Sequence, residues 1–94
     1  MATYEILSWK DIPAVVEVRD ESQSVTCQLS DRFQALIDSV AVQLGLDDAE
    51  KYLAEWMRSD PRERAGSAAD VAAVVVAELE ERFTEFVSRA FRQP

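Results

Sequence analysis

The fold is decided by residues 3–29, which read TYEILSWKDIPAVVEVRDESQSVTCQL. Strand-forming residues alternate here between apolar and polar positions in three stretches, 3–9, 14–19 and 24–29. Pro13 interrupts after the first stretch because it lacks a backbone N–H, and the polar run 20–23 forms a turn after the second. The pattern predicts a three-stranded antiparallel meander, with Cys27 on its inward face.

Helical periodicity begins directly after this meander. Ser30 is a suitable N-cap for a first helix that runs to about Leu44, before Gly45. Its apolar face comprises Phe33, Leu36, Ile37, Val40 and Leu44. We expect a shorter second helix, capped by Asp47 with Glu50 and carrying Leu53, Trp56 and Met57. An exposed loop over 58–66 follows.

A third helix is predicted from the Ser67 and Asp70 cap to about Phe91. Its stripe comprises Val71, Val75, Leu79, Phe83, Val87 and Phe91, widened by Val74 and Phe86. We therefore predict an α+β fold, a single two-layer domain over residues 1–94 with a three-stranded antiparallel sheet followed by three helices packed on one face. A helix of this length spans about 37 Å, more than such a sheet covers.

Composition excludes several classes of function. The chain has 94 residues, a net charge of −8, no histidine and one cysteine. Without histidine, Ser-His-Asp, Cys-His and zinc-hydrolase chemistry are excluded. The sequence also lacks a glycine-rich phosphate loop and an oxygen-ligand loop for a hard cation, so we predict no cofactor and no metal. Composition leaves a Glu/Asp pair for acid–base work open, but helix capping and a solvated helix face explain the carboxylate clusters, so we expect no catalytic residue and no enzyme. The acidity disfavours nucleic acid and anionic membranes as partners. Met1 to Ile12 lacks a signal-peptide pattern and no apolar run could span a bilayer, so we expect a cytoplasmic protein.

Three segments are candidate interaction surfaces. Trp9, Lys10, Asp11 and Ile12 form either a recognition edge stiffened by Pro13 or a core tryptophan followed by an ordinary connection. The cationic cluster Arg58, Arg62 and Arg64 forms either an anion or partner site or internal ion pairs with the surplus acids. Phe86 and Phe91 either form an apolar patch for a partner or second copy, or fold back onto the first two helices.

Several of these motifs together resemble a known family. They are YEILSWKDIP at 4–13, LSDRF at 29–33 with Ala35 and Ile37-Asp38, Tyr52-Leu53 with Trp56, and Gly66-Ser67 before Val71-Ala72. They are similar to the bacterial virulence factor domains, and to the terminal domain of conserved virulence factor C proteins. The resemblance implies a regulatory role in virulence beside helical repeats, which these 94 residues lack, and it supplies no catalytic residue.

Two functions follow as hypotheses. The first is a non-enzymatic protein-interaction or regulatory module that binds a protein partner or forms a homo-oligomer. The second comes from the resemblance, which associates stand-alone relatives with folate and corrinoid one-carbon enzymes. It is an accessory subunit or small-molecule binder with a concave pocket bordered by Trp9 or Trp56 and at least one arginine.

Overall fold

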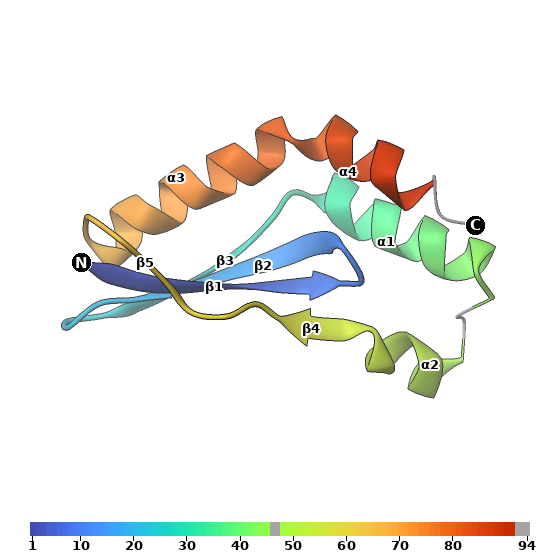
Figure 1. Cartoon of the computed structure of the whole chain (residues 1–94), viewed down its shortest axis with the longest axis horizontal. Helices are drawn as coiled ribbons and strands as arrows, with labels where there is room; N and C mark the ends of the chain where they lie inside the picture. Colours follow the sequence, from blue (N-terminus) through green and yellow to red (C-terminus); the bar gives the residue numbers. More distant parts are fainter. Residues whose placement is uncertain (46–47, 92–94) are drawn as a thin grey trace.

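A computed structural model describes residues 1–45 and 48–91, and within them five antiparallel strands form one sheet. Helices cover most of one face of that sheet (Figure 1). In chain order the elements are β1 (Ala2–Trp9), β2 (Ile12–Arg19), β3 (Ser24–Gln28), α1 (Asp31–Gln43), α2 (Ala49–Ala54), β4 (Trp56–Arg58), β5 (Arg62–Arg64), α3 (Ala68–Glu81) and α4 (Phe83–Ala90).

The predicted meander is confirmed. β1, β2 and β3 pair in sequence, with Tyr4 opposite Val18 and Val16 opposite Cys27. One irregularity, a register shift between Leu7 and Ser8, lies near the β1–β2 turn. Val16 and Val18 are buried beneath the helices, and Cys27 is half-buried on the same face, as the alternation predicts.

The number of strands was predicted incorrectly. β4 and β5 pair with opposite ends of β1 on the edge that β2 leaves free, where we expected the end of a helix and then a loop. Ser59 connects them to β1, since its N–H donates to the Ile6 carbonyl at 2.9 Å and its Oγ accepts from the Ile6 N–H at 2.8 Å. The free backbone groups of β1 therefore order a segment that carries little strand pattern of its own.

The core lies between the sheet and the helices α1 and α3. Its largest contributors from these helices are Phe33, Leu36, Ile37, Val40, Val71, Val75 and Leu79. Ser67 caps α3 as predicted, accepting a hydrogen bond from the Asp70 N–H at 3.2 Å. Gly45 has a φ of +70°, the left-handed conformation expected where α1 ends.

The third predicted helix is two helices. The chain leaves helical geometry at Arg82, whose N–H bonds to the Leu79 carbonyl three residues earlier. α4 then packs against α1, because Phe33 makes T-shaped contacts with Phe83 and Phe86, with ring centroids 5.0 and 6.0 Å apart. The apolar stripe extends past the sheet, and the break directs its second half onto α1.

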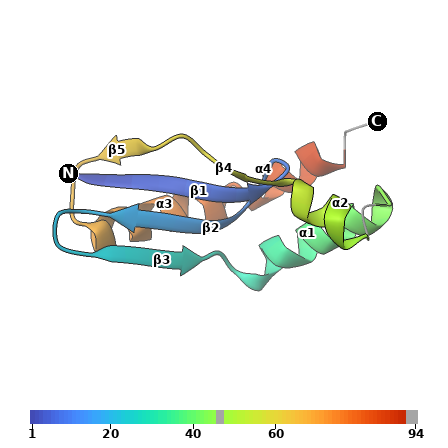
Figure 2. The same cartoon turned by 90° about the horizontal axis from the view of Figure 1, so that it is seen from below.

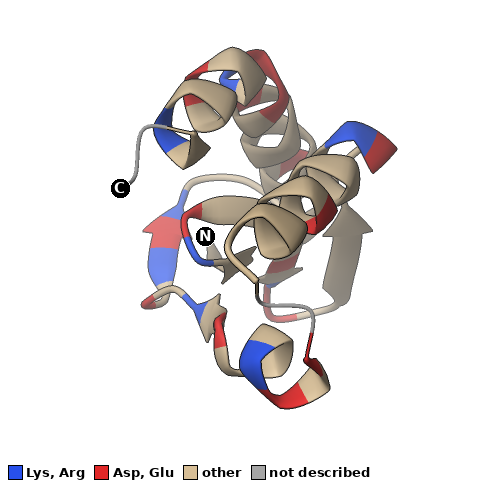
Figure 3. Cartoon of the chain, turned by 90° about the vertical axis from the view of Figure 1, so that its right-hand side faces the viewer, with Lys and Arg blue, Asp and Glu red and all other residues tan. Residues whose placement is uncertain are grey.

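The prediction that all helices pack on one face of the sheet was wrong for α2. It lies on the opposite side of the molecule from α3 and α4 (Figures 1 and 3). Its N-cap is Asp48, whose side chain accepts from the Glu50 N–H at 2.9 Å. The cap predicted at Asp47 lies outside the described residues. Tyr52 of α2 packs on Trp9 with ring centroids 5.5 Å apart, so α2 covers the end of β1.

Candidate interaction surfaces

The hairpin tip between β1 and β2 places two of its four candidate residues in the core. Trp9 is fully buried and Ile12 is 2% exposed, and the Trp9 Nε1–H donates to the Tyr52 carbonyl at 2.8 Å. Lys10 adopts a φ of +54° and lies 3.5 Å from Glu55, while Asp11 is exposed. Neither Trp9 nor Ile12 is therefore exposed for recognition. The structure shows the alternative interpretation, a core tryptophan followed by an ordinary connection.

The two arginines of β5 differ in whether they form an ion pair within the chain. Arg64 forms a two-pronged ion pair with Glu78 of α3, both distances being 2.8 Å, and this pair lowers the pKa of Glu78. The Arg62 side chain is exposed and has no hydrogen bond or ion pair within the part of the chain that the structure describes. It lines a hollow of about 360 Å³ beside Tyr4, between β1 and α3. Arg64 thus forms the internal ion pair that was one of the two alternatives, and Arg62 is available to another molecule.

The two phenylalanines Phe86 and Phe91, at the last helix and its C-cap, differ in their exposure. Phe86 is 5% exposed and folds back on Phe33, the alternative that the sequence left open. Phe91 is 49% exposed at the end of α4. Only Phe91 of this pair can contact another molecule in this conformation.

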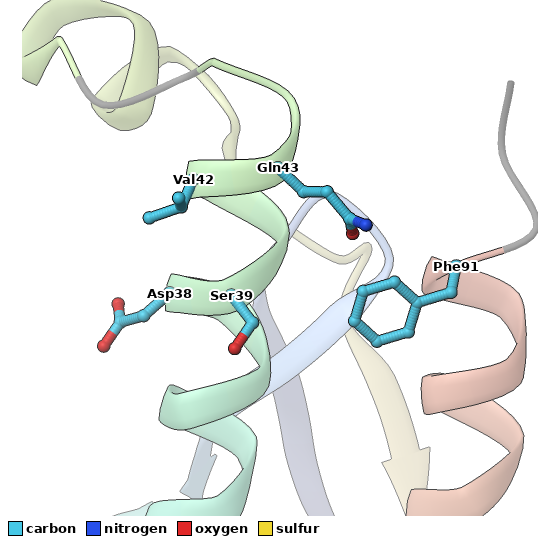
Figure 4. A pocket seen from close by; sticks show the side chains of 5 residues that line it. All are labelled: Asp38, Ser39, Val42, Gln43 and Phe91. Atoms are coloured by element: carbon cyan, nitrogen blue, oxygen red, sulfur yellow. The ribbon is translucent and has the colours of Figure 1, made fainter.

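Phe91 contributes to a shallow surface formed with α1, which we call the end surface. It lines an open hollow of about 530 Å³ with Asp38, Ser39, Val42 and Gln43. Figure 4 shows the Phe91 ring directed towards Ser39 and Gln43, while Val42 and Asp38 project from α1 away from it. Val42 is 74% exposed, an unusually open position for a valine. The sequence does carry a signal for it, since Val42 is an apolar residue outside the predicted stripe of its helix.

The face of the sheet opposite α3 carries an ionic network that sequence reasoning missed. Glu5 is only 8% exposed although it lies on this face, because the guanidinium groups of Arg58 and Arg19 approach its carboxylate to 3.0 and 3.2 Å. Arg58 also pairs with Glu17, which lies opposite Glu5 in the strand register. Hydrogen bonds from Arg58 and then Arg19 lower the pKa of Glu5. These charges satisfy one another, so the network is not an open catalytic pair.

A third hollow, of about 340 Å³, lies beside Trp56. Its other lining residues come from β2, β3 and the start of α1: Ala14, Val15, Gln28, Leu29, Ser30, Asp31, Phe33 and Gln34. Trp56 supplies the aromatic wall that a small-molecule pocket was expected to have. The arginine that was also expected is not among the described residues that line this hollow.

Residues 1–45 and 48–91 contain neither a metal-binding cluster nor a helix able to span a membrane. Within these ranges, no three His, Cys, Asp or Glu side chains converge in a way that could hold a metal ion. None of the helices within the same ranges combines the length and apolarity needed to cross a bilayer.

Comparison with known proteins identifies a family. Residues 7–89 match the family model described as "Virulence factor". No curated protein and no solved structure matches the chain. The match covers the end of β1, all of β2 to β5, and all the helices but the last residue of α4, and it includes the predicted motifs from Leu7 onwards.

Proposed function

The chain belongs to the virulence factor family, and we propose that within this family it is a non-enzymatic protein-interaction module that binds a protein partner through its end surface. The proposal concerns the biochemical role, which the family membership leaves open. It assigns the contact to Phe91, Val42 and the polar residues between them.

The exposure of Val42 and Phe91 is the observation that carries this proposal. Both side chains line the same open hollow, Phe91 on the side of Ser39 and Gln43 and Val42 beside Asp38. Protein interfaces commonly combine an apolar centre with polar groups that form hydrogen bonds at its margin. By contrast, most arginines in the described ranges are held in internal ion pairs, so charged recognition by these side chains has less support.

A small-molecule or accessory-subunit role has weaker support. The hollow beside Trp56 has an aromatic wall, but its described lining contains no cation to fix an acidic ligand such as a folate. Trp9, the other tryptophan considered for such a pocket, is buried. A protein partner at the end surface therefore accounts for more of the exposed features.

The test is affinity purification with mass spectrometry from the source organism, using paired variants. One variant carries Val42→Ser and Phe91→Ser. The matched control carries Leu53→Ser and Met57→Ser, which remove two comparably exposed apolar side chains outside the end surface. A recovered protein is then purified and its affinity for each variant is measured.

The proposal expects a partner that binds the wild type and the control equally and the end-surface variant at least about tenfold more weakly. Equal binding by both variants would assign the contact to another surface and reject the proposal. Failure to recover any specific protein with folded wild-type bait would also count against it.

A further inference from the structure

β3 is an edge strand with unpaired backbone groups. The sheet order is β3-β2-β1-β4, and Figure 2 shows no strand beyond β3. The Leu29 N–H donates to the Ala14 carbonyl of β2 at 2.9 Å. Because backbone groups in an antiparallel strand point alternately to its two sides, Ser24, Thr26 and Gln28 direct their N–H and C=O groups outward. All three residues are exposed, and within the described ranges their outward groups have no hydrogen-bond partner.

The opposite edge of the sheet is protected against strand pairing, and β3 is not. β4 and β5 are three residues each, are separated by a segment that contains Pro61, and carry Arg58, Arg62, Glu63 and Arg64. Short, charged and proline-interrupted edges resist pairing with another chain. β3 reads SVTCQ, with no charge, no proline and continuous register against β2. Figure 3 shows this contrast, with charge colours along β5 and none along β3.

The flank of α3 beside β3 is also uncharged over most of its length. Glu80 marks this flank, because it accepts a hydrogen bond from Ser30 in the connection between β3 and α1, whereas Glu78 points to Arg64 on the other side. Helical spacing places Val76, Ala73 and Ala69 on the Glu80 flank. These short side chains allow a neighbouring helix to approach closely. The neutral strip therefore extends from the strand edge onto the helix above it.

We propose that two copies of this chain pair antiparallel through their β3 strands, about a two-fold axis at Thr26, to form one continuous sheet. The outward groups of Ser24, Thr26 and Gln28 then meet those of Gln28, Thr26 and Ser24 in the second copy, giving about six backbone hydrogen bonds. This pairing is independent of the proposed partner contact at the end surface.

A second copy fits this edge because β3 matches itself on both faces. In the two-fold register Thr26 lies opposite Thr26, and Ser24 opposite Gln28, so polar side chains meet on the open face. On the helix face Val25 lies opposite Cys27, which joins two half-buried apolar side chains. Thr–Thr and apolar cross-strand pairs are favourable, and closed two-fold dimers are the commonest soluble oligomers. An unrelated peptide would have no such built-in match.

The first test measures mass by light scattering during size-exclusion chromatography across a range of concentrations. We expect a concentration-dependent species of twice the 10.6 kDa chain mass. Thr26→Pro removes the central donors, and Thr26→Lys sets two like charges opposite each other, so each should weaken dimerisation about tenfold or more. Thr84→Lys makes the same charge change at an exposed site on α4 and should leave dimerisation unchanged. Circular dichroism establishes that each variant is folded.

The second test fixes the register. Val25→Cys places a thiol opposite the native Cys27 of the second copy, at the close non-hydrogen-bonded position of an antiparallel pair, within disulfide range. Mild oxidation should give a covalent dimer, which adding Cys27→Ser should abolish. The two native Cys27 residues lie diagonally, about 7–8 Å apart, so the wild type should not cross-link.

Three results would overturn the proposal. The first is a strictly monomeric wild type at the highest attainable concentration. The second is a dimer unaffected by both Thr26 variants, and the third is cross-linking of Val25→Cys that does not require Cys27. A dimer that persists in all the β3 variants would place the contact on another surface.

Discussion

Glu80 accepts hydrogen bonds from both the backbone N–H and the hydroxyl of Ser30, at 2.7 and 2.8 Å. This carboxylate comes from α3, fifty residues further along the chain, and it lies at the start of α1. Arg32 donates to it as well and stacks over the Phe83 ring at 4.4 Å. One side chain therefore joins the end of α3 to the N-cap and the first turn of α1.

Glu80→Ala should lower the free energy of unfolding by about 1 kcal/mol, a typical loss for a helix-capping interaction. The Ser30 side chain makes no cap hydrogen bond of its own, so the start of α1 depends on this contact. Glu81→Ala is the matched control, since that neighbouring side chain is exposed and has no ion pair within the described ranges. Urea denaturation measures both variants, and equal losses would show that Glu80 has no special role.

Stability should fall in acid and change little between pH 6 and 8. The pKa of Glu5 is lowered by Arg58 and Arg19, and that of Asp20 by the backbone N–H groups of Ala68, Ser22 and Gln23. A carboxyl with a lowered pKa stabilises the fold above its unfolded pKa of about 4, and this stabilisation is lost as the pH falls through the folded pKa. With no histidine in the chain, no side chain of unperturbed pKa titrates between pH 6 and 8.

Glu5→Gln tests the source of this acid sensitivity. It removes the titrating carboxylate from the network, so the difference in melting temperature between pH 7 and acid should be smaller than in the wild type. Glu63→Gln is the control, because Glu63 is exposed on β5 and has no ion pair in the described part of the chain. If both variants show the wild-type acid dependence, the Glu5 network is not its cause.

The two phenylalanines of the last helix should respond differently to truncation. Phe86 is buried against Phe33, so Phe86→Ala should lower the free energy of unfolding by about 3 kcal/mol or more. Phe91 is half exposed, so Phe91→Ala should change it by less than about 1 kcal/mol. Denaturant titration of the pair measures the contrast, and a large loss at Phe91 would mean that its ring stabilises the α1–α4 contact rather than remaining available.

The elements that sequence predicted well are those whose signal is local. Period-two alternation specified β1 to β3, and the Ser67 and Asp70 pair specified the start of α3. β4 and β5 were missed because the edge of β1 creates their strand geometry, through contacts such as Ser59 with Ile6. The break at Arg82 was missed for a similar reason, since the apolar period continues through it and the packing of Phe83 on Phe33 is a tertiary contact.

Tertiary contacts, which sequence does not show, also decided which candidate surface residues are buried. Trp9, Ile12 and Phe86 resemble exposed anchors in sequence, yet Tyr52 covers Trp9 and Phe33 packs against Phe86. The Glu5 network required the register that places Glu17 opposite Glu5 and Arg58 opposite Leu7. A hint was present, because both glutamates occupy polar positions of the predicted meander. Involvement of the half-buried Lys10 and of the exposed Asp11, Arg62 and Phe91 in an interaction stays a prediction.

Dimerisation through β3 should strengthen as salt is added. Each copy carries a net charge of −8, so two copies repel, whereas β3 contributes no ion pair that salt could weaken. Raising ionic strength from 0.1 to 1 M shortens the screening length from about 10 to about 3 Å, which reduces this repulsion. Sedimentation equilibrium at the two ionic strengths should therefore give a lower dimer dissociation constant in high salt. The Thr26→Pro variant, measured in parallel, should have a dimer dissociation constant about tenfold higher or more at both ionic strengths. A dimer that weakens with salt would instead indicate an interface held by ion pairs, which β3 cannot provide.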